Sequence, residues 1–247
     1  MNLLVDIGNT SVKWACANGL QFVQTGRFEH AGGDPDAQME QAWGALPAPG
    51  RVMAANVAGG VRATRLCAWV ERAWQLQPAF VRAARQAAGI TNAYTEPAQL
   101  GADRWAAMIA AWHAIRGAVC VVDCGTAITI DLIDTAGQHR GGQILPGVTM
   151  MRHALGTRTA QLPRVHGQRE PVLLARDTDA AIYSGTLYAA AAAIERIVAD
   201  MATATGLRPE LVLTGGAATL LTPQLLPAFS YDADLVLKGI ALLAGDT

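Results

Sequence analysis

An acidic turn between two apolar runs occurs twice in this chain, and this repeat constrains the fold more than any other feature. Residues 3–14 read LLVDIGNTSVKW and residues 120–130 read CVVDCGTAITI. Each copy places an aspartate, one further residue, a glycine and then a hydroxyl side chain behind a strand-like run. A single copy would be an ordinary turn between strands, because Gly and Asn tolerate left-handed backbone conformations. Two copies predict two related halves, each opening with a strand, a tight acidic turn and a second strand.

The remaining pattern alternates short β-rich runs with helical ones. Apolar periodicity predicts helices over residues 36–46, 63–74, 104–116, 148–155 and 179–200. Residues 211–221 and the closing run ADLVLKGIALLA each read as a strand followed by a helix. This alternation predicts an α/β fold with mixed sheets flanked by helices. We expect two lobes, residues 1–117 and 118–247, with a ligand cleft between them.

Composition limits the classes of function. The chain has 247 residues, 51% of them apolar, which is enough for one large or two modest cores. Its net charge of -1 gives no electrostatic reason to expect nucleic acid binding. No apolar run approaches the roughly 20 residues that cross a bilayer, and the opening MNLLV does not resemble a signal peptide. We expect a cytoplasmic protein without a membrane partner, whose four cysteines are buried thiols.

Both turns have the chemistry of a nucleotide phosphate site. Glycines let backbone N–H groups approach oxygen atoms, and Asn9, Thr10 and Thr126 add side-chain donors. A carboxylate beside a phosphate chain repels it unless a cation lies between them. Asp6 and Asp123 therefore imply a cation, and Mg²⁺ is expected because it combines one or two carboxylates with phosphate oxygens and water. Lys13 either neutralises a further phosphate charge or is a solvated strand lysine.

Taken together, the motifs resemble those of type III pantothenate kinases, within the superfamily of acetate and sugar kinases, Hsp70 and actin. The resemblance covers the whole chain. Within that family, the chain is also similar to the members once described as virulence accessory factors in transcription. The motifs are DIGNT at 6–10, NAYTEPAQLGADRW at 92–105, VVDCGTA at 121–127, GGQILPG at 141–147, DTDAAIYSGTLYA at 177–189 and LTGGAA at 213–218. The resemblance implies two actin-like (ribonuclease H-like) lobes with a nucleotide cleft between them. It also implies ATP-dependent phosphorylation of pantothenate to 4'-phosphopantothenate, the first committed step of coenzyme A biosynthesis.

The family motifs also imply which residues bind ATP. The first phosphate motif corresponds to Asp6, Ile7, Gly8, Asn9, Thr10, Ser11, Val12 and Lys13. Thr126 corresponds to the second phosphate motif, and Gly215 and Gly216 to a loop on the adenosine side, where the backbone passes close to the nucleotide.

The substrate site is implied by the LGADRW motif and its upstream loop. Asp103 corresponds to the family's general base, which accepts the proton of the substrate hydroxyl and holds that oxygen in line with the γ-phosphorus. The alternative role for Asp103 is the N-cap of a helix starting at Arg104. The implied substrate contacts are Tyr94, Gly101, Ala102, Asp103, Arg104 and Thr178. Thr178 is implied to complete the site across a homodimer interface, although the run 177–179 also reads as a helix cap.

The resemblance further implies a monovalent cation, K⁺ or NH₄⁺, held by Asp123, while Asp6 stays the candidate for Mg²⁺. No histidine is proposed as catalytic. Two other functions stay open. A related kinase with another small substrate would share both phosphate motifs but would have no reason to keep LGADRW. A nucleotide-binding accessory protein of transcription, acting without catalysis or beside it, would call for a basic patch or recognition helix, and the sequence contains neither.

Overall fold

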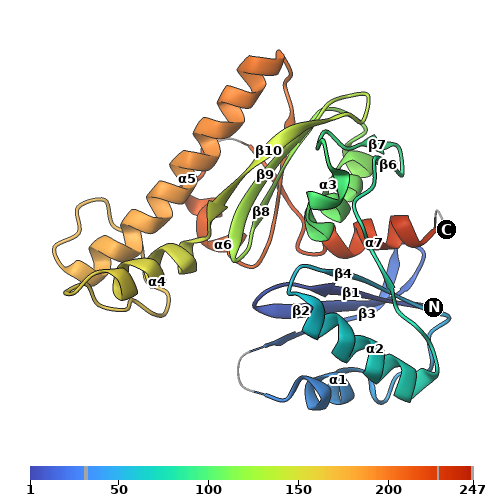
Figure 1. Ribbon diagram of the computed structural model, residues 1–247. Coiled ribbons are helices and arrows are strands. Elements are labelled where there is room, and N and C mark those ends of the chain that lie inside the picture. The colour runs from blue at the N-terminus through green and yellow to red at the C-terminus, as the bar shows by residue number, and fades with distance from the viewer. Residues whose placement is uncertain (31–32, 227, 246–247) are drawn as a thin grey trace. The chain divides into compact units, whose positions relative to one another are not determined.

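The computed structural model describes residues 1–30, 33–226 and 228–245, which form two compact units (Figure 1). Unit 1 comprises Met1–Arg116, Ala136–His139 and Asp234–Thr247, and unit 2 comprises Gly117–Thr135 and Arg140–Ala233. The predicted division at 117/118 therefore differs from these units at Gly117 and in two segments, residues 136–139 and 234–247. The larger one is the C-terminal segment, which packs with unit 1 through helix α7 (Leu235–Gly245).

Unit 1 is built on a five-stranded sheet of order β3-β2-β1-β4-β5. Its strands are β1 (Asn2–Ile7), β2 (Ser11–Asn18), β3 (Gln21–Glu29), β4 (Arg51–Asn56) and β5 (Ala79–Phe80). The other elements of unit 1 are α1 (Pro35–Trp43), α2 (Gly60–Trp74), β6 (Gln86–Ala87), β7 (Ile90–Thr91), η1 (Pro97–Gln99) and α3 (Ala102–Ile115). β1 to β3 form an antiparallel meander, whereas β4 pairs in parallel with both β1 and β5.

Unit 2 repeats this arrangement in a second five-stranded sheet of order β10-β9-β8-β11-β12. Its elements are β8 (Val119–Cys124), β9 (Ala127–Ile133), β10 (His139–Pro146), α4 (Val148–Arg158), α5 (Thr178–Thr205), β11 (Glu210–Thr214), α6 (Ala218–Leu221), η2 (Thr222–Gln224) and β12 (Ser230–Tyr231). β8 pairs antiparallel with β9 and parallel with β11, as β1 does with β2 and β4. The predicted internal repeat is thus confirmed at the level of sheet topology.

Each sheet has its own apolar core. In unit 1, indole rings pack edge to face, with ring centroids 5.4 Å apart for Trp43 and Trp69 and 6.4 Å apart for Trp14 and Trp43. Large aromatic side chains contribute most of the burial in such clusters.

The long helix α5 of unit 2 has a cap at each end. It begins at an N-cap, Asp177, whose carboxylate accepts from the Ala180 N–H at 2.8 Å. It ends before Gly206, which has a left-handed conformation.

Helix α3 differs from its prediction. The sequence predicted a single apolar stripe along residues 104–116, but the side chains from Arg104 to Ala111 are all buried. The cause is α7, which packs against α3 so closely that a Cβ on Gly239 would collide with the backbone of Ala106. The predicted strand at the start of ADLVLKGIALLA is also wrong. The strand of this region is β12, ahead of that run, and the run itself forms α7, which is buried between α3 and the strands β1, β2 and β4.

Within the described part of the chain, no helix is both long enough and apolar enough to span a membrane.

Candidate active site

The first phosphate motif forms the turn between β1 and β2. Asp6 and Lys13 lie directly opposite each other in the register of the two strands. The N–H of Gly8 donates to the carbonyl of Ser11 at 3.0 Å, which closes the turn and leaves Asn9 and Thr10 exposed at its tip. Ile7 and Val12 are buried in the core, so only their backbones are available to a nucleotide.

The second motif forms the equivalent turn between β8 and β9. The N–H of Gly125 donates to the carbonyl of Ala127 at 3.0 Å, and Thr126 is exposed at the tip. Gly147, the last residue of GGQILPG, packs on this turn and donates its N–H to the carbonyl of Thr126 at 3.0 Å. A Cβ on Gly147 would lie 2.5 Å from that oxygen, so glycine is required for this close packing. The motif thus supports the backbone of the turn.

The Gly215–Gly216 loop of unit 2 lies against Asp123. Gly215 follows β11 with a φ of +92°, and a Cβ there would overlap the Asp123 carboxylate and lie 2.6 Å from the backbone nitrogen of Cys124. Gly216 is exposed beside it. Burial, followed by the charge of Asp123, raises the pKa of the Cys124 thiol to about 12, so this cysteine is an uncharged packing residue.

The LGADRW motif forms the start of α3. The helix begins at Ala102, and Gly101 takes the N-cap position without a side-chain bond. The alternative interpretation of Asp103 as the N-cap is therefore wrong, because this residue lies inside the first turn. Its Oδ1 accepts from the N–H of Arg104 at 2.7 Å, and a Cβ on Gly101 would lie 2.5 Å from the same oxygen. Glycine at 101 thus leaves the room that the Asp103 carboxylate occupies.

Arg104 and Tyr94 meet directly. The buried guanidinium of Arg104 donates to the Tyr94 hydroxyl at 2.9 Å and lies 5.6 Å from the centre of its ring. Four of the predicted substrate residues, Tyr94, Gly101, Asp103 and Arg104, are therefore connected by direct contacts, and Ala102 lies between two of them. They combine a cation, a carboxylate and an aromatic face.

Sequence reasoning missed two residues of this group. Arg85 donates to three carbonyls of the loop that carries Tyr94, those of Asn92 at 3.0 Å, Tyr94 at 2.8 Å and Thr95 at 2.8 Å. His139, buried at 3% exposure, stacks on the Tyr94 ring with centroids 6.0 Å apart. An arginine ahead of a loop rich in Pro, Asn and Gly was a usable signal for Arg85. His139 had no sequence signal, since it comes from a distant hairpin.

Thr178 lies in unit 2 as the first residue of α5, and its side chain is exposed. It borders a cavity of about 1190 Å³ formed by α4, residues 175–178 and the first turns of α5. Most of the residues lining the cavity are apolar, including Met150, Leu155 and Ile182, while Arg158 and Arg176 add two cations.

Among the described residues, no group of three or more His, Cys, Asp and Glu side chains could hold a metal ion. Asp6 and Asp123 are each the only acidic residue of their turn. A single carboxylate fits a Mg²⁺ ion that takes its other ligands from phosphate oxygens and water.

Three solved structures share the actin-like fold of this chain. A conserved putative Baf family transcriptional activator from Campylobacter jejuni superposes with a TM-score of 0.62 at 21% identity, covering 98% of this chain and 97% of that one. A putative 2-dehydro-3-deoxygalactonokinase from Sinorhizobium meliloti superposes with a TM-score of 0.57 at 14% identity, covering 99% of this chain and 98% of that one. The activator of 2-hydroxyisocaproyl-CoA dehydratase from Clostridium difficile gives 0.55 at 12%, covering 99% and 94%. At these identities the likeness concerns the fold alone.

Sequence comparison narrows this class to one family. Residues 2–200 match the family described as type III pantothenate kinase. The type III pantothenate kinase of Nitrosococcus oceani is 39% identical over 100% of this chain and 95% of its own length. That of Burkholderia thailandensis is 40% identical, covering 98% and 97%. The chain belongs to the type III pantothenate kinase family.

Proposed function

We propose how the residues described above divide the work of the family's reaction, the ATP-dependent phosphorylation of pantothenate. In this reaction the primary hydroxyl oxygen of pantothenate attacks the γ-phosphorus of ATP, the bond to the β–γ bridging oxygen breaks, and ADP leaves. The product, 4'-phosphopantothenate, enters coenzyme A biosynthesis. Because the transition state is loose, the protein contributes chiefly by positioning and by stabilising charge.

The two exposed turns bind the phosphates of ATP. Asn9 and Thr10 at one tip and Thr126 at the other offer donors, and Lys13 supplies a positive charge opposite Asp6. Asp6 holds the divalent ion that accompanies ATP, either directly or through its water ligands. The Gly215–Gly216 loop, which has no side chains, accommodates the adenosine side of the nucleotide.

Asp103 is the general base. The observation that carries this assignment is the direct contact of its carboxylate with the Arg104 N–H, beside the pair formed by Arg104 and Tyr94. A carboxylate fixed at this point can orient the hydroxyl of pantothenate and accept its proton as the phosphorus–oxygen bond forms. Arg104 is a cation suited to the carboxylate of pantothenate, and the Tyr94 ring is suited to its apolar body.

Asp123 binds a monovalent cation, K⁺ or NH₄⁺. Its carboxylate lies against the backbone at Gly215, and backbone carbonyls together with a carboxylate form a ligand set suited to such an ion. Substituting K⁺ by Na⁺ should lower activity in the native enzyme and have little effect on Asp123→Asn, which lacks the ion's anionic ligand.

The enzyme acts as a homodimer in which Thr178 contributes to the pantothenate site of the partner subunit. The support is the apolar cavity of about 1190 Å³ that Thr178 borders, together with Leu173 and Leu174 just ahead of it, which are 78% and 84% exposed. Exposed apolar surface on this scale favours a protein partner. Leu173→Asp combined with Leu174→Asp should yield a monomer by light scattering. Because ATP is its co-substrate, we place the enzyme in the cytoplasm.

The deciding experiment measures phosphopantothenate formation from MgATP by the native enzyme and by Asp103→Asn. Native activity with a loss of several orders of magnitude in the variant, at unchanged ATP affinity, supports both the reaction and the base. An active Asp103→Asn variant would leave the kinase in place but remove the base assignment. If native protein forms no product with K⁺ or NH₄⁺ present, the proposed division of roles fails.

A further inference from the structure

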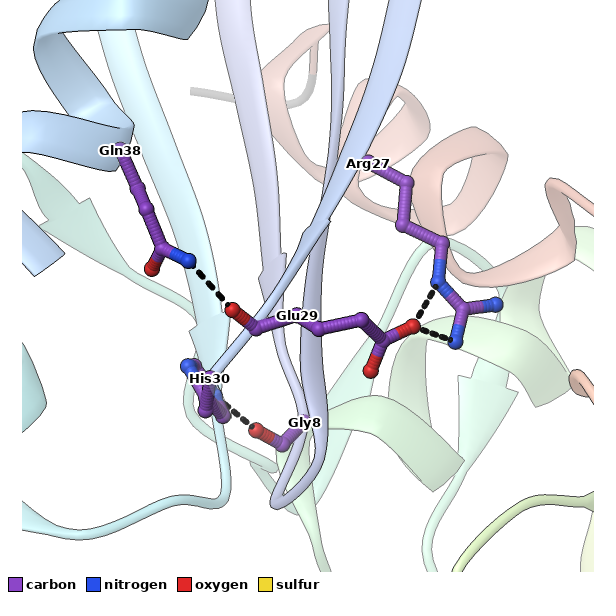
Figure 2. A network of polar contacts seen from close by, with 5 residues as sticks. All are labelled: Gly8, Arg27, Glu29, His30 and Gln38. Atoms are coloured by element: carbon purple, nitrogen blue, oxygen red, sulfur yellow. Dashed lines mark hydrogen bonds and ion pairs between the residues drawn. The ribbon is translucent and has the colours of Figure 1, made fainter. Parts of the chain in front are cut away.

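One histidine, His30, hydrogen-bonds to the backbone of the β1–β2 turn that carries the first phosphate motif. His30 directly follows β3, and its ring nitrogen Nε2 lies 2.7 Å from the carbonyl oxygen of Gly8 (Figure 2). A carbonyl only accepts, so Nε2 carries the proton and donates it. The backbone N–H of His30 also donates to the carbonyl of Thr10 at 2.8 Å. A single residue therefore binds two carbonyls of the same four-residue turn.

These two bonds fix the direction of peptide groups in the turn. A trans peptide is planar, so its N–H points away from its C=O. With the Gly8 carbonyl turned toward His30, the N–H of Asn9 points to the opposite side. Asn9 and Thr10 are the exposed residues of the turn. His30 thus directs the Asn9 N–H away from β3, at the exposed tip of the turn.

The surroundings of His30 argue against a purely packing role for its ring. The ring borders a small pocket that is lined mostly by apolar side chains, among them Ile7, Phe28 and Met39, and also by Arg62 and Arg65. Its Nδ1 is buried, and no described residue hydrogen-bonds to it. A polar ring in such a place is costly unless it makes a useful bond, and Phe or Leu would fill the space without that cost. The bond to Gly8 is what the imidazole provides and an apolar side chain cannot.

We propose that His30 is a positioning residue of the ATP site, which orients the Gly8–Asn9 peptide for phosphate binding. This proposal rests on the assignment of the β1–β2 turn to the ATP phosphates. It adds a residue that lies outside the DIGNT motif in the sequence and that acts through the backbone of the turn.

The neighbouring contacts provide a matched control. Gln38 of α1 donates to the backbone carbonyl of Glu29 at 2.7 Å, and the side chains of Arg27 and Glu29 form an ion pair on β3 (Figure 2). Gln38→Leu therefore weakens the end of β3 next to His30 but leaves the Gly8 carbonyl bond in place. This variant therefore shows how far a less stable end of β3 lowers MgATP affinity by itself.

The test compares His30→Phe, His30→Gln and Gln38→Leu in the full-length protein. His30→Phe keeps a ring but removes the donor, whereas His30→Gln can place an amide N–H near the position of Nε2. We expect His30→Phe to weaken MgATP binding about tenfold, the effect of one lost hydrogen bond, and to raise KM for ATP equally. KM for pantothenate should stay unchanged. His30→Gln should recover most of the ATP affinity, and Gln38→Leu should keep it.

Calorimetry with MgATP and no pantothenate reads the affinity without catalysis, so the result does not depend on Asp103 or on turnover. Unchanged MgATP affinity in a folded His30→Phe variant would overturn the proposal. An equal loss in Gln38→Leu would also overturn it, because loosening of β3 would then be sufficient. A native enzyme that binds MgATP but forms no product would instead contradict the proposed function. The MgATP affinities of the variants would still decide whether His30 positions the turn.

Discussion

Gly215 and Asp123 lie so close together that the carboxylate of Asp123 occupies the space where a side chain at position 215 would begin. The contact joins the β11–α6 loop to the β8–β9 turn within unit 2. It connects the loop assigned to adenosine with the aspartate assigned to a cation. A change at position 215 should therefore affect both.

Gly215→Ala should destabilise the protein by about 1–3 kcal/mol, because the new methyl group overpacks this contact and strains a backbone with φ of +92°. It should also reduce kcat, since Asp123 must move. Urea denaturation and steady-state kinetics measure the two effects. Gly206→Ala is the control, because Gly206 has a φ of +69° but open space around it. Equal effects of the two substitutions would mean that backbone strain alone, without the Asp123 contact, is responsible.

Gly101→Ala should lower kcat by about 100-fold while leaving the fold intact. The φ of Gly101 is -57°, which any residue adopts, so the cost falls on the Asp103 carboxylate that the new methyl group displaces. A displacement of about 1 Å of a reacting group costs about 100-fold in rate. Kinetics beside a thermal melt test this. Gly60→Ala, at an open position at the start of α2, should be neutral, and a fully active Gly101→Ala would contradict the placement of Asp103.

Arg85→Met should raise KM for pantothenate about tenfold, because the loop carrying Tyr94 loses its bonds from one guanidinium. Arg85→Lys should restore little, since a single ammonium cannot replace the planar fork that reaches three carbonyls. The ATP KM should not change. Arg82→Met removes an exposed arginine three residues away and serves as the control. If Arg85→Met changed KM for ATP but not KM for pantothenate, Arg85 would not act by supporting the loop that carries Tyr94.

The buried thiols should resist alkylation at pH 8. Burial raises the pKa of Cys120 and of Cys124 from 9.0 to about 12, with the charges of Asp131 and Asp123 adding to the shift. Both stay protonated in the folded state. Cys67 is partly exposed, so the expectation that all four cysteines are buried is wrong at this position, and Cys67 should react with iodoacetamide. Because the folded pKa values exceed the unfolded ones, their contribution to stability is complete below pH 9 and is lost as the pH rises toward 12. Peptide mass mapping before and after denaturation measures the reactivity. Rapid labelling of Cys124 in folded protein would contradict its burial.

The sequence predicted most of what depends on local pattern and repetition. The two Asp-Gly turns implied duplicated sheets, and the sheets have matching strand orders. Periodicity placed α2 and α5 within a few residues of their observed ends. The motif at 92–105 contains both Arg104 and Tyr94, and the structure brings these two residues into contact, while their binding of substrate stays a prediction.

What the sequence did not predict depends on contacts between distant segments. The burial of every residue from Arg104 to Ala111 of α3 needs α7, which is more than a hundred residues away in the chain. His139 meets Tyr94 only because a hairpin returns to unit 1. Arg85 and His30 act on backbone carbonyls, and such contacts leave no periodic trace in a sequence.

The packing of α7 on α3 also sets the order in which this protein can be completed at the ribosome. The apolar surface of α3, including Trp105 and Met108, is synthesised more than a hundred residues before its cover, residues 235–245. Until that segment emerges, the first unit exposes a surface that can associate with other nascent chains. A chain that ends before residue 235 therefore also leaves α3 of unit 1 uncovered. Chaperones and proteases can recognise this exposed apolar surface.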